Sequence, residues 1–128
     1  MKSVTALVLC GLLAPNLPAM ALEGDAERGK RVFNQCRSCH RLAGSPGSSF
    51  GPELGSIFGR VVGKQPGFEY YSDFFQSASF VWTPTLMDTW LKDPMSMYPA
   101  STMMSRGVPD PQSRADLIQY LKTVSTDH

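Results

Sequence analysis

Cys36-Arg37-Ser38-Cys39-His40 is a C-x-x-C-H sequence, and this stretch decides the fold. Two thiols separated by two residues can each add to one of the two vinyl groups of a single porphyrin, and the histidine that follows is then held beside the iron. The pentapeptide therefore predicts one covalently attached haem c, with Cys36 and Cys39 forming the thioethers and His40 as an axial ligand.

Other uses of a C-x-x-C pair are less consistent with the surrounding sequence. A redox dithiol would follow a buried strand, whereas residues 23–35 are polar and helix-like. A zinc site would need further ligands, and the other His of the chain is His128 at its end. A structural disulfide between Cys36 and Cys39 is the remaining alternative.

The iron of such a haem has a second axial position, and the sequence offers methionines for it. Of the seven Met, five follow residue 21, and three of these lie in or just after an expected helix. The other two, Met103 and Met104, lie in the turn-rich stretch 98–107. A loop of this kind can wrap a flat cofactor, and a thioether is a soft, uncharged ligand that raises the reduction potential.

The first 21 residues predict a secretory signal peptide. Lys2 is a basic start, residues 4–13 are largely apolar, and Ala19-Met20-Ala21 is an A-x-A cleavage sequence. An uncleaved N-terminal anchor is the alternative. We expect residues 1–21 to be removed after about Ala21 and residues 22–128 to form one soluble, periplasmic domain without stable membrane insertion.

Composition narrows the class of the exported domain. Without Lys2 it has 11 basic and 11 acidic residues and is formally neutral. A neutral chain lacks the basic face with which nucleic-acid binders neutralise phosphates, so no nucleic-acid partner is expected. A length of 107 residues allows one compact domain and excludes a multi-domain enzyme.

The pattern of caps and apolar residues predicts an all-α fold. Three main helices are expected over about 25–34 and 84–92 and from Asp110-Pro111 onward, with a short fourth within 71–79. Loops rich in Gly and Pro lie between them, at 44–52, 59–67 and 98–111. Because a core of this length is small, a buried porphyrin would supply the missing apolar volume.

In the order and spacing of these features the chain resembles the class I bacterial and mitochondrial cytochromes c over nearly all of residues 22–128. The resemblance implies a small monohaem fold of helices and long loops wrapped around the cofactor. It rests on Gly24-Asp25, Gly29 to Phe33, Cys36 to His40, Gly51 to Leu54, Phe58-Gly59-Arg60, Gly63 to Tyr70, Trp82, Leu86 to Pro94, Pro99 to Gly107 and Ala115 to Lys122.

The resemblance also implies roles near the iron. Met103, four residues after Pro99, occupies the position of the family's axial methionine and is preferred over Met104. The Pro52 carbonyl is expected to accept the other ring proton of His40, which would fix the orientation of the imidazole.

Away from the iron, the resemblance places Arg60, Tyr70 and Trp82 at the haem propionates, as hydrogen-bond donors or charge partners. It also implies that Gly29 lies against Tyr120 where the first and last helices cross.

Two departures from the family pattern concern the haem surroundings. Trp90 stands where the family has a tyrosine that hydrogen-bonds the axial sulfur, and the lysines that ring the haem edge of the mitochondrial protein are mostly absent. Long-range steering to an acidic partner should therefore be weak. We expect docking through an apolar patch, with Arg37, Arg41 and Arg106.

These features together predict a monomeric periplasmic carrier of single electrons rather than an enzyme. Its partners would be redox proteins: a dehydrogenase, a membrane complex or an oxidase. Two alternatives remain open: a haem protein with a labile Met ligand that acts as a peroxidase or binds gases, and a docked subunit of a larger oxidoreductase.

Overall fold

The computed structural model describes residues 22–43 and 50–124, so the expected signal segment 1–21 lies outside it. Within the described ranges the regular structure is helical, with an isolated antiparallel bridge between Val61 and Val81. The all-α class is confirmed. The helices are α1 (Ala26–Phe33), α2 (Asp73–Ser77), α3 (Pro84–Lys92), α4 (Pro94–Met97) and α5 (Pro111–Thr123).

Three helices begin at the caps that the sequence predicts. The side chains of Asp25, Thr83 and Asp110 each accept a hydrogen bond from the backbone N–H three residues later, at 2.7, 3.1 and 2.7 Å. Such bonds satisfy one of the free N–H groups of a first helical turn. Pro84 and Pro111 occupy the first turn of α3 and α5, where proline's missing N–H costs nothing.

Helix α4 was not expected, and Pro94 is the reason for both α4 and the end of α3. The residue before a proline avoids the helical region, and Asp93 leaves α3 with φ −163°. Proline is also well suited to the first position of a new helix, and the Asp93 carboxylate accepts the Ser96 N–H at 3.0 Å. The prediction that Pro94 stops a helix is thus correct but incomplete.

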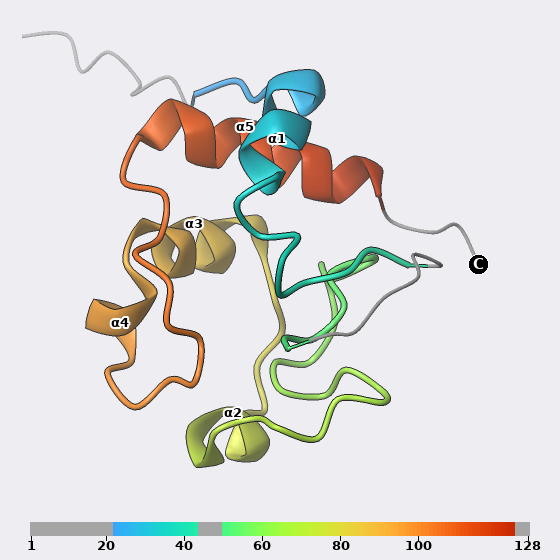
Figure 1. Ribbon diagram of the computed structural model, residues 1–128, viewed down its shortest axis with the longest axis vertical. Helices are drawn as coiled ribbons and strands as arrows, with labels where there is room; N and C mark the ends of the chain where they lie inside the picture. The colour runs from blue at the N-terminus through green and yellow to red at the C-terminus, as the bar shows by residue number, and fades with distance from the viewer. Residues whose placement is uncertain (1–21, 44–49, 125–128) are drawn as a thin grey trace, which may run out of the picture.

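Helices α1 and α5, from the two ends of the described chain, cross in close contact (Figure 1). A Cβ on Gly29 would lie 2.0 Å from the Asp116 carbonyl oxygen and 2.7 Å from the Cβ of Tyr120. The expected proximity of Gly29 and Tyr120 is confirmed, and only glycine allows the two backbones to approach this far. Next to it, the rings of Phe33 and Tyr120 pack with centroids 5.6 Å apart.

A buried carboxylate reinforces this crossing. Asp116 accepts hydrogen bonds from Arg28 Nε at 2.7 Å, from Arg28 Nη2 at 2.9 Å and from the backbone N–H of Asp25 at 2.8 Å. Gln112 Nε2 donates to the same carboxylate at 3.0 Å. These bonds, the Arg28 pair foremost, hold the pKa of Asp116 well below its usual range.

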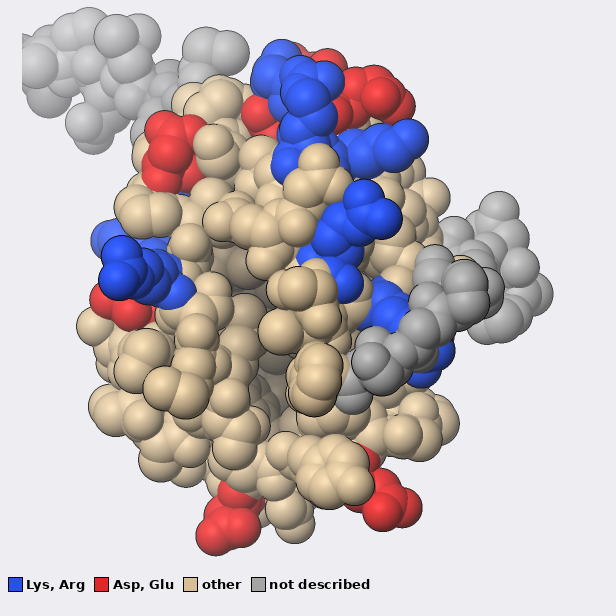
Figure 2. All heavy atoms as spheres, viewed as in Figure 1, with Lys and Arg blue, Asp and Glu red and all other residues tan. Residues whose placement is uncertain are grey.

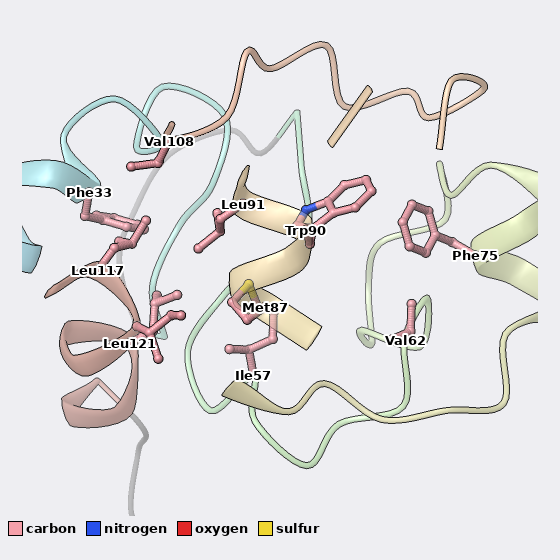
Figure 3. Packing of buried hydrophobic residues seen from close by; sticks show 11 residues of the cluster. Phe33, Ile57, Val62, Phe75, Met87, Trp90, Leu91, Val108, Leu117 and Leu121 are labelled. Carbon is pink, nitrogen blue, oxygen red and sulfur yellow. The ribbon is translucent and has the colours of Figure 1, made fainter. Parts of the chain in front are cut away.

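The hydrophobic core extends from this crossing toward α2 (Figure 3). Figure 3 shows Leu117 and Leu121 of α5 on the side of the core where Phe33 lies, with Leu91 and Met87 of α3 facing them. On the other side of α3, the ring of Trp90 packs edge-on against the ring of Phe75 of α2, with the ring centroids 5.2 Å apart. Helix α3 therefore joins the crossing to the part of the chain that carries the long loops.

The loops make up much of the lower half of the molecule in Figure 1, where α2 lies far from the crossing. Helix α4 and the segment that leads from it to α5 form one flank. Among residues 22–43 and 50–124, no helix is long and apolar enough to cross a membrane.

Candidate haem site

A cavity of about 490 Å³ lies within the core, lined mostly by apolar and aromatic side chains. This volume is within the range of about 300–1,000 Å³ that is typical of cofactor and small-molecule sites. Helices α1, α3 and α5 contribute walls, and so do residues 35, 36, 38–40, 101–105, 107 and 108. Segments that are far apart in the sequence, the C-x-x-C-H stretch and the loop with the two methionines, thus meet at one cavity.

Tight turns after α1 present the C-x-x-C-H residues to this cavity. The N–H of Cys36 donates to the Phe33 carbonyl at 2.8 Å, and the N–H groups of Cys39 and His40 donate to the Cys36 carbonyl at 3.1 and 2.9 Å. Cys36, Cys39 and His40 all line the cavity.

The two thiols do not form a disulfide. Burial, together with the charge of nearby Cys39, raises the pKa of the Cys36 thiol to about 11. A catalytic redox dithiol needs the opposite shift, because the thiolate is the reactive form. Among residues 22–43 and 50–124, no group of three or more His, Cys, Asp and Glu side chains is arranged so that it could hold a metal ion by itself.

His40 is held as a neutral imidazole in which a hydrogen bond occupies one ring nitrogen and the other can bind a metal. Its Nδ1 lies 2.8 Å from the Pro52 carbonyl oxygen, the contact that the sequence analysis expects. Burial lowers the pKa of the ring, and the Pro52 bond opposes that shift only in part. Since a ring nitrogen that faces a carbonyl must donate, Nε2 carries the lone pair and is available to a metal.

Gly51 allows the Pro52 segment to pack directly on this imidazole. A Cβ on Gly51 would lie 2.5 Å from His40 Cε1, and the Gly51 N–H donates to the Cys39 carbonyl at 2.8 Å. The ring is therefore fixed by packing as well as by its hydrogen bond.

The two candidate methionines differ in burial. Met103 is partly buried and packs against the hydrophobic core, whereas Met104 is 85% exposed. Both line the cavity, with Met104 at its rim. The backbone N–H of Met103 donates to Ser101 Oγ at 3.1 Å, so a local turn holds the Met103 backbone beside the cavity.

Arg60 and Trp82, which the family resemblance places at the haem propionates, also line the cavity. The Arg60 guanidinium donates to the carbonyl oxygens of Glu53, at 2.9 Å, and Gly55. Burial lowers the Arg60 pKa, with Tyr71 and Glu53 opposing the shift. The backbone N–H of Trp82 donates to the backbone carbonyl of Arg60 at 2.9 Å, so the two residues lie side by side.

Tyr70, the third residue expected at the propionates, does not line the cavity. Its side chain is 80% exposed, and its neighbour Tyr71 lines the cavity instead. Adjacent side chains in a non-helical segment point to different sides, so only one of the two tyrosines can face inward. The Tyr71 hydroxyl accepts the Gln65 N–H at 3.3 Å, and burial raises the Tyr71 pKa. In the sequence, the adjacent pair Tyr70-Tyr71 shows that either tyrosine could be the one that faces the cavity.

Comparisons with known proteins agree with this arrangement. The sequence profile of the cytochrome c family matches residues 26–125. The chain belongs to the cytochrome c family. It is 35% identical to cytochrome c2 of Blastochloris viridis over 120 residues, which are 94% of this chain and 90% of that protein. It is 32% identical to cytochrome c2 of Rhodomicrobium vannielii, over 96% of this chain and 97% of that one.

A solved structure extends the likeness to the fold. Cytochrome cH from Methylobacterium extorquens superposes with a TM-score of 0.70 at 32% identity, covering 78% of this chain and 99% of that one. The protein is thus a class I c-type cytochrome of electron-transfer type, and its cofactor is a haem c attached through cysteines.

The residues present fit such a group. The cavity is apolar, two unpaired thiols and a neutral imidazole with a free Nε2 lie along it, and a thioether comes from the loop that closes it. Trp90 lines the same cavity and is buried at 5% exposure, with its ring centroid 6.2 Å from that of Trp82.

Proposed function

We propose that this cytochrome carries single electrons between redox proteins, with His40 and Met103 as the two axial ligands of a haem attached through Cys36 and Cys39. The proposal is supported by one observation above all: a single cavity is lined by the C-x-x-C-H residues and by the partly buried Met103. The haem supplies the iron that gains and loses the electron.

The polypeptide's part is to hold both ligands still. Pro52 and Gly51 orient His40, and the Ser101 turn holds the Met103 backbone in place. Ligands that stay in place in both oxidation states keep reorganisation small, and an iron with both axial positions occupied has no open site for a substrate. A carrier is therefore favoured over an enzyme.

Arg60, Trp82 and Tyr71 are proposed to face the haem propionates. Their positions along the cavity and the Arg60 charge support this role. Tyr71 replaces Tyr70 in this set because Tyr70 points into solvent.

The ligand assignment is tested by the visible spectrum of the oxidised protein. A weak charge-transfer band from methionine sulfur to iron should appear at the red end of the spectrum. We expect Met103→Ala to abolish it, because the remaining ligands contain no sulfur, and the matched variant Met104→Ala to retain it. Loss of the band in Met104→Ala alone would contradict the assignment, and rapid CO binding to the reduced wild type would favour a gas-binding or peroxidase-type site.

We propose that the partner docks on an uncharged surface around the cavity mouth. Phe50 and Met104 both line the cavity and are 80% and 85% exposed. Figure 2 shows mostly uncharged atoms around the hollow at the centre of the view, with basic side chains above it and to its right. Apolar contact rather than charge then drives association, so its rate should change little between low and high salt. A steep fall with salt would contradict this docking mode.

We further propose export to the periplasm, with residues 1–21 as a cleaved signal peptide. The basic start, short apolar run and Ala19-Met20-Ala21 support it. N-terminal sequencing of the mature protein should begin near Leu22. Gel filtration of a native extract should show a monomer, and elution with a large complex would instead indicate a bound subunit.

A further inference from the structure

The loop that carries the methionines, residues 98–110, is internally bonded around Met103. The N–H of Ser101 donates to the Tyr98 carbonyl at 3.0 Å, and that of Ser105 donates to the Met103 carbonyl at 3.0 Å. Met103 and Gly107 donate to the hydroxyls of Ser101 and Ser105 at 3.1 and 3.0 Å. These bonds shape the methionine loop, but they do not fix it to the rest of the protein.

The C-terminal end of the methionine loop is anchored on α3. The Val108 N–H donates to the Leu91 carbonyl at 2.6 Å. Gly107, at φ +75°, lies so close that a Cβ would be 2.5 Å from the same carbonyl oxygen. The loop thus leaves the cavity against the last turn of α3.

Arg114 of α5 closes this anchor from the other side. Its Nη1 donates to the carbonyl oxygens of Val108 at 3.0 Å and Pro109 at 2.8 Å, and its Nε donates to Asp88 of α3 at 2.7 Å. The side chain is buried, and a buried cation is tolerated only when its charge and donors are satisfied. One guanidinium therefore joins α3, α5 and the methionine loop.

We propose that Arg114 is a positioning residue for Met103: by clamping residues 108 and 109 between α3 and α5, it keeps the methionine loop closed over the haem. The proposal rests on Met103 as the axial ligand. Arg114 touches neither iron nor porphyrin, and it acts through the loop's C-terminal anchor. When the clamp weakens, the loop opens more often and Met103 leaves the iron more often.

A control arginine, Arg28, lies on α1 and pairs with a carboxylate of α5. Arg28 pairs with buried Asp116 at 2.7 Å, as Arg114 pairs with Asp88 at 2.7 Å, but Arg28 contacts the α1–α5 crossing and not the loop. Arg28→Lys and Arg114→Lys each keep the charge and lose the planar set of donors. The Arg28 side chain is 49% exposed and that of Arg114 is 8% exposed. If Arg114 only adds stability, loop exchange in the two variants should therefore follow the fall in their denaturation midpoints.

The test is hydrogen–deuterium exchange of the peptide that spans residues 99–106 in the haem-loaded protein. Arg114→Lys should speed exchange about tenfold, as expected from losing one charge-assisted hydrogen bond. It should also weaken the sulfur-to-iron band and speed CO binding to the reduced form. Arg28→Lys should lower the denaturation midpoint but leave all three loop readouts near wild type.

Asp88→Asn extends the test in case Arg114→Lys does not fold. It leaves the two carbonyl bonds of Arg114 in place and removes only its charge partner, so a smaller increase in loop exchange is expected. Equal loop exchange in the Arg28 and Arg114 variants, or unchanged exchange in both Arg114→Lys and Asp88→Asn, would overturn the proposal. If Met103→Ala keeps the band, the ligand assignment fails, while the exchange data still report whether the clamp holds the loop.

Discussion

The α1–α5 crossing and the methionine loop differ in where their packing contacts come from. At the crossing, the polypeptide supplies all the contacts: Gly29 lets the backbones meet, and Asp116 collects donors from α1 and α5. The methionine loop is bonded to itself and to one anchor, and it borders a cavity of about 490 Å³. The protein alone thus fills the packing at the α1–α5 crossing, whereas the methionine loop borders a cavity of the size that a cofactor needs.

From this difference we expect substitutions in the two regions to change different properties of the protein. Close-packed backbones have no room to adjust, so added atoms at the crossing are costly. Around the cavity, packing depends on the haem, and changes there should alter ligation before they alter folding. The following predictions test that division, in order of decreasing effect.

Loss of the haem should have the largest effect. Without the haem, the largely apolar lining of a cavity of about 490 Å³ would be exposed to water, and the segments around it would lose the group on which they pack. The double variant Cys36→Ala with Cys39→Ala, produced without attached haem, should therefore lose most of its helical circular dichroism. A cooperative thermal transition in that variant would show that the chain folds without the haem, and it would contradict this prediction.

Gly29→Ala should be the most damaging single substitution at the crossing. The new Cβ would meet the Asp116 carbonyl oxygen at 2.0 Å, and we expect a loss of at least about 3 kcal/mol in denaturant unfolding. Gly59→Ala is the control: it has φ +84° but no atom within 4 Å of the added Cβ, so only backbone strain of about 1 kcal/mol is expected. Similar losses in the two variants would contradict the packing argument.

Asp116→Asn should destabilise the protein by about 2 kcal/mol at pH 7, because Arg28 loses its buried charged partner and keeps only the half-exposed Asp25 at 3.9 Å. The folded-state pKa of Asp116 is lowered, so its contribution is complete above the unfolded value of about 3.9 and is lost as pH falls through the folded value. Denaturation midpoints measured from pH 7 to pH 2 should fall less steeply in the variant. Exposed Asp73→Asn should change stability by less than about 0.5 kcal/mol.

The smallest effects concern the two adjacent tyrosines. Tyr71→Phe removes a half-buried hydroxyl that accepts the Gln65 N–H and should cost about 1 kcal/mol, with a measurable shift in reduction potential. Tyr70→Phe should change stability by less than about 0.5 kcal/mol and leave the potential unchanged, because Tyr70 lies in solvent. If a redox titration found a larger shift in reduction potential for Tyr70→Phe than for Tyr71→Phe, Tyr70 and not Tyr71 would be the tyrosine near the haem.

Much of this protein could be predicted from the sequence because the relevant signals are local. The caps Asp25, Thr83 and Asp110 act over three residues, and the C-x-x-C-H spacing matches one porphyrin edge. Local spacing is set by chain geometry, so these features need no knowledge of distant contacts. The Gly29–Tyr120 and His40–Pro52 contacts came from a family resemblance.

Other features were decided only when the chain folded. The choice of Tyr71 over Tyr70, and the burial of Met103 beside exposed Met104, depend on which face of an irregular segment packs inward. The Arg114 clamp joins residues from α3, α5 and the loop between them, and α4 begins where Asp93 both leaves one helix and caps the next. Sequence determines which groups are available within a few residues of one another. Tertiary packing decides which of them share a buried site, because burial is a property of all the surrounding segments together.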